Sequence, residues 1–195
     1  MYRREGTDEI IVAHRGTEFD RQPLIDGAVD AAMVTTRLNV QREDALALTR
    51  EAMKIAKDGG YGPVYVTGHS LGGALAQITA HHYNLPGDAF NPYGAAGLAH
   101  RVPEGQPASA APFTNHVMAG DVVSASSPNY GKVEMYALPK ELEVLRTAEQ
   151  AQRITSLAVP GLKSGHAVSA VAAIQLGDSH RLIHFLDRTT DKGPV

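Results

Sequence analysis

The chain has 195 residues, of which 43% are hydrophobic and 20% charged, and its formal net charge is -3. These values are ordinary for a globular protein, and we expect residues 1–195 to form one domain with a sizeable core. The absence of a basic surplus argues against nucleic acid as the partner. The sequence contains no Cys, which excludes disulfides, zinc–thiolate sites and a cysteine nucleophile.

The first residues are polar, and no apolar run of about 18 residues occurs anywhere in the sequence. These features predict neither a signal peptide nor a transmembrane segment. We therefore expect a soluble protein, either cytoplasmic or exported by a route that needs no signal. Strand-like residues begin as early as Ile10, so we also expect this domain to be excised from a longer chain.

The first half of the sequence alternates between strand-like and helix-like segments. Residues 9–14 are rich in β-branched apolar residues and predict a buried strand that ends at an Arg-Gly-Thr turn. Residues 18–40 indicate no element, whereas 42–57 mix charges with strong helix formers and predict a helix stopped by Asp-Gly-Gly. Residues 63–67 predict a second buried strand, and 74–83 predict a helix of small residues.

The second half continues the alternation after a loop at 92–112 that is rich in Pro and Gly. Further strands are predicted at 88–91, 115–118 and 133–138, and helices at 140–153 and within 165–176 and 179–187. Strands that alternate with helices favour an α/β fold whose central sheet is mostly parallel.

The turn between the second strand and the small-residue helix, Gly68-His69-Ser70-Leu71-Gly72, matches G-x-S-x-G. In this nucleophile elbow the serine occupies a strained strand-to-helix turn, and small neighbours let the strand and the helix approach each other. An ordinary Gly-rich turn is the alternative, but the flanking strand and helix are the context that the elbow requires. Neither a phosphate-binding loop nor a dinucleotide-binding fingerprint is present. We therefore predict that Ser70 is a nucleophile and that the Leu71 N–H contributes to an oxyanion hole.

In this type of fold an acid follows the serine in the sequence, and a histidine follows the acid. Asp121 follows the predicted strand at 115–118 after a short Ala-Gly turn, which favours it as the acid. A simple turn-forming role is the alternative for Asp121, and Asp178 is the second candidate acid. Three histidines lie downstream of Asp121, namely His166, His180 and His184.

Four segments resemble class three (fungal-type) lipases, which have the α/β-hydrolase fold, a three-layer sandwich around the mostly parallel sheet. They are Val12–Thr17, Val66–Ala76, Asn115–Val123 and Ser179–Leu186. The sequence departs from that family at His14, where the family usually has Phe, and it shows no apolar lid helix.

The resemblance implies a role for each matching residue. It implies that Thr17 shares the oxyanion hole with Leu71, that Asp121 is the triad acid and that His180 is the base. The order of the residues leaves His166 as the alternative base. His180 and His184 have the spacing of zinc ligands on a helix, but position 181 is Arg where a zinc-protease motif has Glu. We therefore predict no metal site, and the triad needs no cofactor.

The function that the resemblance implies is hydrolysis of carboxylic esters in acyl lipids, as by a lipase or phospholipase, with transient contact to a membrane surface. An esterase or thioesterase for soluble acyl substrates is one alternative, and a catalytically inactive lipase-like binding domain is another. Signal-less bacterial lipase domains of this type also occur as toxic effectors within longer chains. In that case an immunity protein would be the partner.

Overall fold

The computed structural model describes residues 1–16, 31–98, 100–158, 179–186 and 193–194. Within these residues, seven strands form one sheet in the order of the sequence. The strands are β1 (Tyr2–Arg3), β2 (Ile10–His14), β3 (Val64–His69), β4 (Gly87–Phe90), β5 (Phe113–Met118), β6 (Lys132–Ala137) and β7 (Gly193–Pro194). Strands β2 to β6 are parallel, and the short edge strands β1 and β7 are antiparallel to their neighbours. The predicted α/β class with a mostly parallel sheet is confirmed.

The helices of the described residues are α1 (Ala31–Gly59), α2 (Leu71–Tyr83), α3 (Pro139–Ala158) and α5 (Ile183–Leu186), with a 3-10 turn, η1, at Ser124–Ser126. The strands predicted at 9–14, 63–67, 88–91, 115–118 and 133–138 are all present within a few residues. The helix predicted within 165–176 lies outside the described residues. Of the helix predicted within 179–187, the structure describes residues 179–186, and among these Ile183–Leu186 are helical.

Helix α1 is longer than the helix predicted at 42–57. Its buried residues recur at helical spacing and so form one mostly apolar face: Val34, Leu38, Ala45, Leu46, Thr49, Ala52 and Ala56. The residues of its first turns include Val, Thr and Asn, which have modest intrinsic helix propensity. Packing of the apolar face, rather than local propensity, therefore stabilises the part of α1 that the sequence did not indicate.

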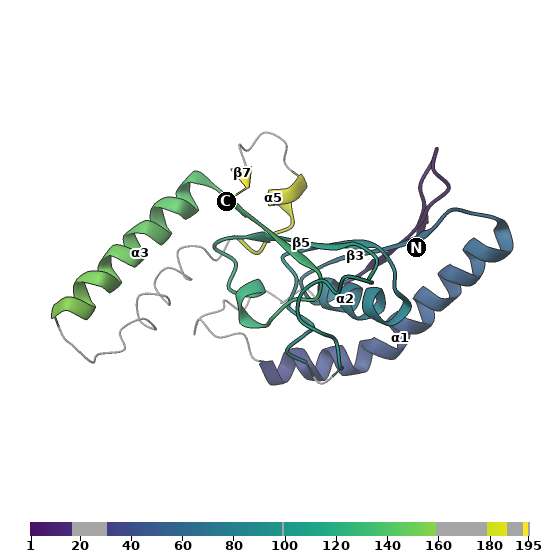
Figure 1. The fold of residues 1–195 in the computed structure, drawn as a ribbon, viewed down its shortest axis with the longest axis horizontal. Helices are drawn as coiled ribbons and strands as arrows, with labels where there is room; N and C mark the ends of the chain where they lie inside the picture. Colours follow the sequence, from purple (N-terminus) through teal and green to yellow (C-terminus); the bar gives the residue numbers. More distant parts are fainter. Residues whose placement is uncertain (17–30, 99, 159–178, 187–192, 195) are drawn as a thin grey trace.

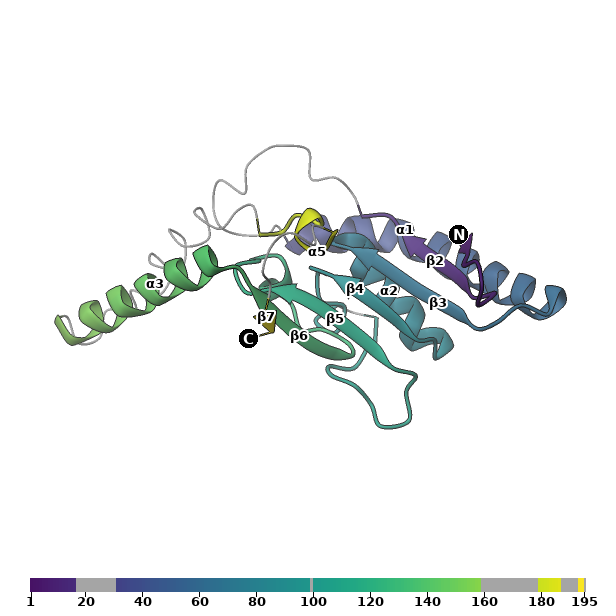
Figure 2. The same ribbon diagram turned by 90° about the horizontal axis from the view of Figure 1, so that it is seen from above.

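Helices α1 and α2 cover the same face of the sheet (Figures 1 and 2). This follows from the topology. From β2 to β4 each new parallel strand is added on the same side of the previous one, and the connections are right-handed, so the connecting helices lie on one face of the sheet. Helix α2 packs against β2, β3 and β4 and also against α1, which itself contacts β2 and β3, and all of Leu71–Ala80 is buried. Its Gly and Ala residues allow this close packing.

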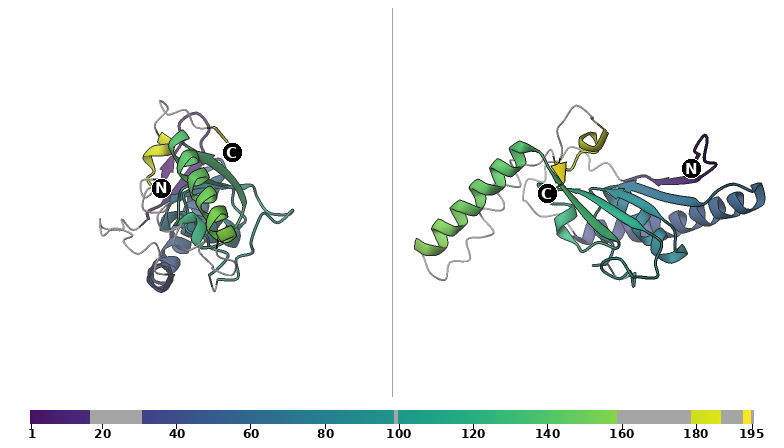
Figure 3. Two further views of the ribbon diagram at one scale, coloured as in Figure 1. Left: turned by 90° about the vertical axis from the view of Figure 1, so that its left-hand side faces the viewer. Right: turned by 45° about the horizontal axis from the view of Figure 1, so that its top comes forward.

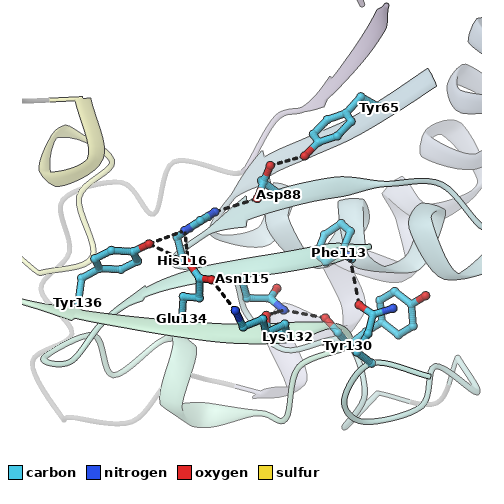
Figure 4. A network of polar contacts seen from close by, with 10 residues as sticks. Tyr65, Asp88, Phe113, Asn115, His116, Tyr130, Lys132, Glu134 and Tyr136 are labelled. Atoms are coloured by element: carbon cyan, nitrogen blue, oxygen red, sulfur yellow. Dashed lines mark hydrogen bonds and ion pairs between the residues drawn. The ribbon is translucent and has the colours of Figure 1, made fainter. Parts of the chain in front are cut away.

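The opposite face of the sheet carries a row of polar side chains (Figure 4). The Tyr65 hydroxyl donates a hydrogen bond to Asp88, and His116 Nε2 lies 2.8 Å from Asp88 Oδ1. The Tyr136 hydroxyl lies 3.1 Å from His116 Nδ1 and 3.0 Å from Glu134 Oε2, to which it donates. The row therefore crosses β3, β4, β5 and β6 on the face that α1 and α2 leave open.

Helix α5 sits on this second face through one aromatic residue. The Phe185 ring packs against the Phe90 ring at 5.3 Å and edge-on against the Tyr136 ring at 6.2 Å, between ring centroids. Helix α3 instead extends away from the sheet (Figure 3). None of the helices in the described part of the chain is both long and apolar enough to cross a membrane.

Candidate active site

Ser70 lies at the sharp turn between β3 and α2, with a backbone φ of 58°. A positive φ is unfavourable for a residue with a side chain, and such strain is typical of functional positions. The Ser70 hydroxyl makes no capping bond to α2. It is therefore available for another partner.

Glycine is required on both sides of Ser70. A Cβ atom on Gly68 would lie 2.2 Å from the Gly72 carbonyl oxygen, and one on Gly72 would lie 2.3 Å from the His14 carbonyl oxygen. Both distances are far shorter than any van der Waals contact. The G-x-S-x-G spacing thus reflects the close approach of β2, β3 and α2 around the serine.

The structure brings Ser70, His180 and Asp121 together. His180 Nε2 lies 2.8 Å from Ser70 Oγ, and His180 Nδ1 lies 3.0 Å from Asp121 Oδ1. The Asp121 carboxylate can only accept, so we assign the proton of the neutral imidazole to Nδ1. The bare Nε2 then accepts a hydrogen bond from the Ser70 hydroxyl, which is the arrangement in which an imidazole can remove the serine proton.

The carboxylate of Asp121 is fully buried, with 0% of its side chain exposed. Besides His180, it accepts hydrogen bonds from the Val123 N–H at 3.1 Å and the Ser124 N–H at 3.3 Å. The Ser124 hydroxyl donates a further bond at 2.6 Å. These donors compensate the loss of hydration and hold the carboxylate in place. No motif in the sequence indicates Ser124, although a position three residues after an Asp in a turn is a usual place for such a bond.

The structure describes some of the other predicted site residues and not others. Thr17, His166 and Asp178 lie outside the described residues. Leu71 is the first residue of α2, so its N–H has no carbonyl partner within the helix. Gly16 packs directly against the elbow, since a Cβ atom there would lie 2.7 Å from the His69 carbonyl oxygen. The Arg-Gly end of the resembling segment is thus adjacent to Ser70.

A cavity of about 610 Å³ opens beside Ser70. The strand ends and the elbow line it together with α5: Ala13, His14, Arg15, Gly16, Thr67, Gly68, His69, Ser70, Phe90, His180, Leu182, Phe185 and Leu186. On the α5 side, Leu182 is 36% exposed and Leu186 66% exposed, so apolar side chains continue from the cavity wall to the surface. The cavity therefore offers an apolar surface next to the serine.

His14, at the end of β2, is a buried neutral histidine. Its Nε2 lies 3.1 Å from the Thr79 hydroxyl oxygen, and that hydroxyl donates its own proton to a carbonyl of α2. His14 Nε2 must therefore donate this bond. Burial lowers the pKa of His14 to about 4. His14 thus has a structural role, in which it packs and donates a hydrogen bond between the sheet and its helices.

The polar row on the open face does not reach the serine. The hydrogen bond from His116 lowers the pKa of Asp88, which is therefore ionised but is paired with Tyr65 and His116. Within the described parts of the chain, no three His, Asp or Glu side chains cluster as metal ligands would. Asp121 is thus the carboxylate that pairs with His180.

One comparison with known proteins identifies a family. A family model described as a Tle-like phospholipase domain, of the phospholipase-like group, matches residues 1–180. It supports a lipase- or phospholipase-like family without singling out the class three lipases that four segments resemble. No curated protein matches the sequence.

Proposed function

Because the chain belongs to the family of Tle-like phospholipase domains, we propose that it is a serine hydrolase that cleaves carboxylic esters of acyl lipids. The observation that carries this proposal is the alignment of Ser70 Oγ, the His180 imidazole and the Asp121 carboxylate at 2.8 and 3.0 Å. The strained elbow that presents Ser70 supports the same assignment. The residue roles follow those that the resemblance to class three lipases implies.

In the proposed reaction, His180 removes the Ser70 proton while Ser70 Oγ attacks the ester carbonyl carbon. The oxygen of the resulting tetrahedral intermediate is bound by the Leu71 N–H and by Thr17, which we assign from the resemblance alone. His180 then donates its proton to the leaving alcohol, and an acyl-enzyme remains. Water, deprotonated by His180, hydrolyses the acyl-enzyme and restores the Ser70 hydroxyl. Asp121 holds the imidazole tautomer and stabilises the imidazolium.

The apolar cavity favours acyl lipids over polar esters. An acyl chain that enters it would be removed from water along the side chains of Ala13, Phe90 and Leu186. The exposed side chains of Leu182, just before α5, and Leu186, at its end, extend this surface outward, which suits a substrate that is presented by a lipid aggregate. The same apolar lining would also accept the acyl part of a soluble ester.

The test is hydrolysis of p-nitrophenyl esters of short and long chain and of phospholipid vesicles. Wild type is compared with Ser70→Ala, His180→Ala and His166→Ala. We expect the first two variants to lose at least about a thousandfold in kcat and His166→Ala to remain active. If His166→Ala is the inactive variant, His180 is not the base. If wild type hydrolyses none of these substrates, the proposed function is wrong.

Two measurements separate the alternatives. An esterase or thioesterase for soluble substrates would show equal rates above and below the critical micelle concentration of its substrate, whereas we expect a rise above it. An inactive binding domain would not react with a fluorophosphonate probe. We expect the probe to label Ser70 in folded wild type and not in Ser70→Ala.

We further propose that the domain acts as a toxic bacterial effector whose partner is an immunity protein. This rests on the family match and on the occurrence of similar lipase domains as exported effectors. Expression directed to the periplasm of a host bacterium should reduce growth for wild type and not for Ser70→Ala. Equal growth of the two strains, at equal protein levels, would contradict the proposal.

A further inference from the structure

The segment that carries His180 is bound to the sheet by its backbone as well as by its catalytic side chain. The Ser179 carbonyl accepts a hydrogen bond of 2.8 Å from Asn91 Nδ2. The next carbonyl, that of His180 itself, lies 2.6 Å from His69 Nε2 and must accept a hydrogen bond from it. Two consecutive carbonyl groups are thus held by side chains at the ends of two neighbouring strands, His69 at the end of β3 and Asn91 directly after β4.

Asn91, directly after β4, is completely buried. Its backbone φ of 41° lies in the left-handed region, which Asn tolerates better than most residues. Its side-chain oxygen accepts a bond of 2.8 Å from the Met118 N–H, at the end of β5, which leads to Asp121. Its own N–H donates to the His116 carbonyl at 2.8 Å. The Asn91 amide therefore joins the strand that leads to the acid to the segment that carries the base.

His69 directly precedes Ser70 in the sequence. Its ring also packs against the His180 ring, with 4.8 Å between centroids. Burial lowers the pKa of His69, so its ring is neutral at pH 7, and the bond to the His180 carbonyl requires the proton on Nε2. His69 therefore joins the elbow that carries the nucleophile to the segment that carries the base.

We propose that His69 and Asn91 are positioning residues that hold His180 relative to Ser70 and Asp121 through the carbonyls of residues 179 and 180. This inference rests on the proposed function, in which His180 is the base. Proton transfer from Ser70 requires His180 Nε2 within hydrogen-bond distance, and a misplacement of 1 Å can cost about a hundredfold in rate. Because the acceptors are backbone groups, substitutions at Ser179 itself would preserve the anchor.

Four variants separate this role from general stability. His69→Leu removes the donor, whereas His69→Gln retains an N–H that can reach the same carbonyl. Asn91→Asp removes the donor to Ser179 but keeps the acceptor for the Met118 N–H. The matched control is Asn115→Asp, because Asn115 is equally buried and donates to the Tyr130 and Lys132 carbonyls instead.

The kinetic test uses p-nitrophenyl butyrate, a soluble substrate. We expect His69→Leu and Asn91→Asp to lower kcat by about tenfold to a hundredfold with KM changed less than about twofold. His69→Gln should recover most of kcat, and Asn115→Asp should lower Tm without this loss of kcat. The proposal is overturned if folded His69→Leu and Asn91→Asp keep the wild-type kcat, or if Asn115→Asp loses as much as Asn91→Asp.

Hydrogen exchange of peptides covering residues 179–186 tests the anchor without reference to activity. We expect exchange to be faster by about tenfold or more in His69→Leu and Asn91→Asp and unchanged in Asn115→Asp. Unchanged exchange in the first two variants overturns the anchor. If wild type and Ser70→Ala have equal esterase activity, the proposed function is wrong, and the contacts of His69 and Asn91 then have no catalytic role.

Discussion

At the scale of single residues, His14 shows how burial makes the stability of this protein depend on pH. The residue is only 6% exposed, and burial lowers its pKa from 6.5 in the unfolded chain to about 4. Between these two values the unfolded state binds a proton that the folded state does not bind. The contribution of His14 to stability is therefore fully present above about pH 6.5 and is lost as the pH falls toward 4.

We predict that His14→Phe removes this pH dependence. In wild type the contribution of His14 should lower the free energy of unfolding by about 3 kcal/mol between pH 7 and pH 4. Urea denaturation at several pH values, with His82→Gln at an exposed position as control, measures the difference. If His14→Phe and wild type lose stability in parallel over this range, His14 is not responsible.

Two carboxylates, Asp88 on β4 and Asp121 in the loop after β5, give a second prediction at this scale. Asp121→Asn should lower kcat by about a thousandfold or more, because an Asn can stabilise the wrong His180 tautomer and carries no charge to balance the imidazolium. Asp88→Asn should leave kcat within about threefold, because Asp88 bonds to Tyr65 and His116 instead. Ester hydrolysis by the two variants checks the assignment. A comparable loss in both would argue against Asp121 as the specific acid.

At the scale of elements, the elbow depends on the distance between β2 and the start of α2. We predict that Gly72→Ala lowers the free energy of unfolding by about 3 kcal/mol, because the added Cβ would lie 2.3 Å from the His14 carbonyl oxygen. Gly60→Ala, where a Cβ meets no atom within 4 Å but φ is +65°, should cost only about 1 kcal/mol. Chemical denaturation of both variants compares the two costs. Equal costs would show that backbone conformation, rather than close packing, decides the requirement for glycine.

Helix α5 gives a prediction about lipid surfaces. Ile183 is 50% exposed and is not among the residues that line the cavity, so it can contact a lipid aggregate without contacting the acyl chain at Ser70. Ile183→Ser should lower hydrolysis of vesicle phospholipid by about tenfold, because part of an Ile side chain would no longer be buried in the lipid surface. Hydrolysis of p-nitrophenyl butyrate should be unchanged. Val40→Ser, at a 73% exposed position of α1, is the matched control. An equal loss on both substrates would place the effect in the active site rather than at the surface.

At the scale of the whole molecule, the sheet separates two environments. Its face toward α1 and α2 is apolar and closely packed, whereas its other face holds the polar row from Tyr65 to Tyr136 (Figure 4) and also helix α5. Ser70 lies at the end of β3, at the boundary between these two environments. The elbow is thus supported by the core on one side while the cavity opens on the other.

The first half of α1 contributes to this core although the sequence did not indicate a helix there. We predict that Leu38→Ala, at a position with 0% exposure, lowers the free energy of unfolding by about 3 kcal/mol. Val40→Ala, two positions along the same helix, should change it by less than about 0.5 kcal/mol. Thermal and urea denaturation compare the two. A small effect at Leu38 would mean that this part of α1 adds little to the core.

The sequence alone determined the features that depend on local conformation. These are the strand before Ser70, the helix after it, the glycines of the elbow and the alternation that predicts a parallel sheet, because each is encoded within a few neighbouring residues. Ser70 could be predicted as the nucleophile for the same reason. Its catalytic role, like those of Asp121, His180 and the oxyanion-hole residues, stays a prediction until activity is measured.

Only the tertiary structure decided which distant groups meet. His180 is separated by 110 positions from Ser70 and by 59 from Asp121, and residue order alone left three histidines open. The structure also decided the length of α1 and the contacts of His69 and Asn91 with the carbonyls of residues 179 and 180. These features depend on packing between segments far apart in the chain, which no local pattern encodes.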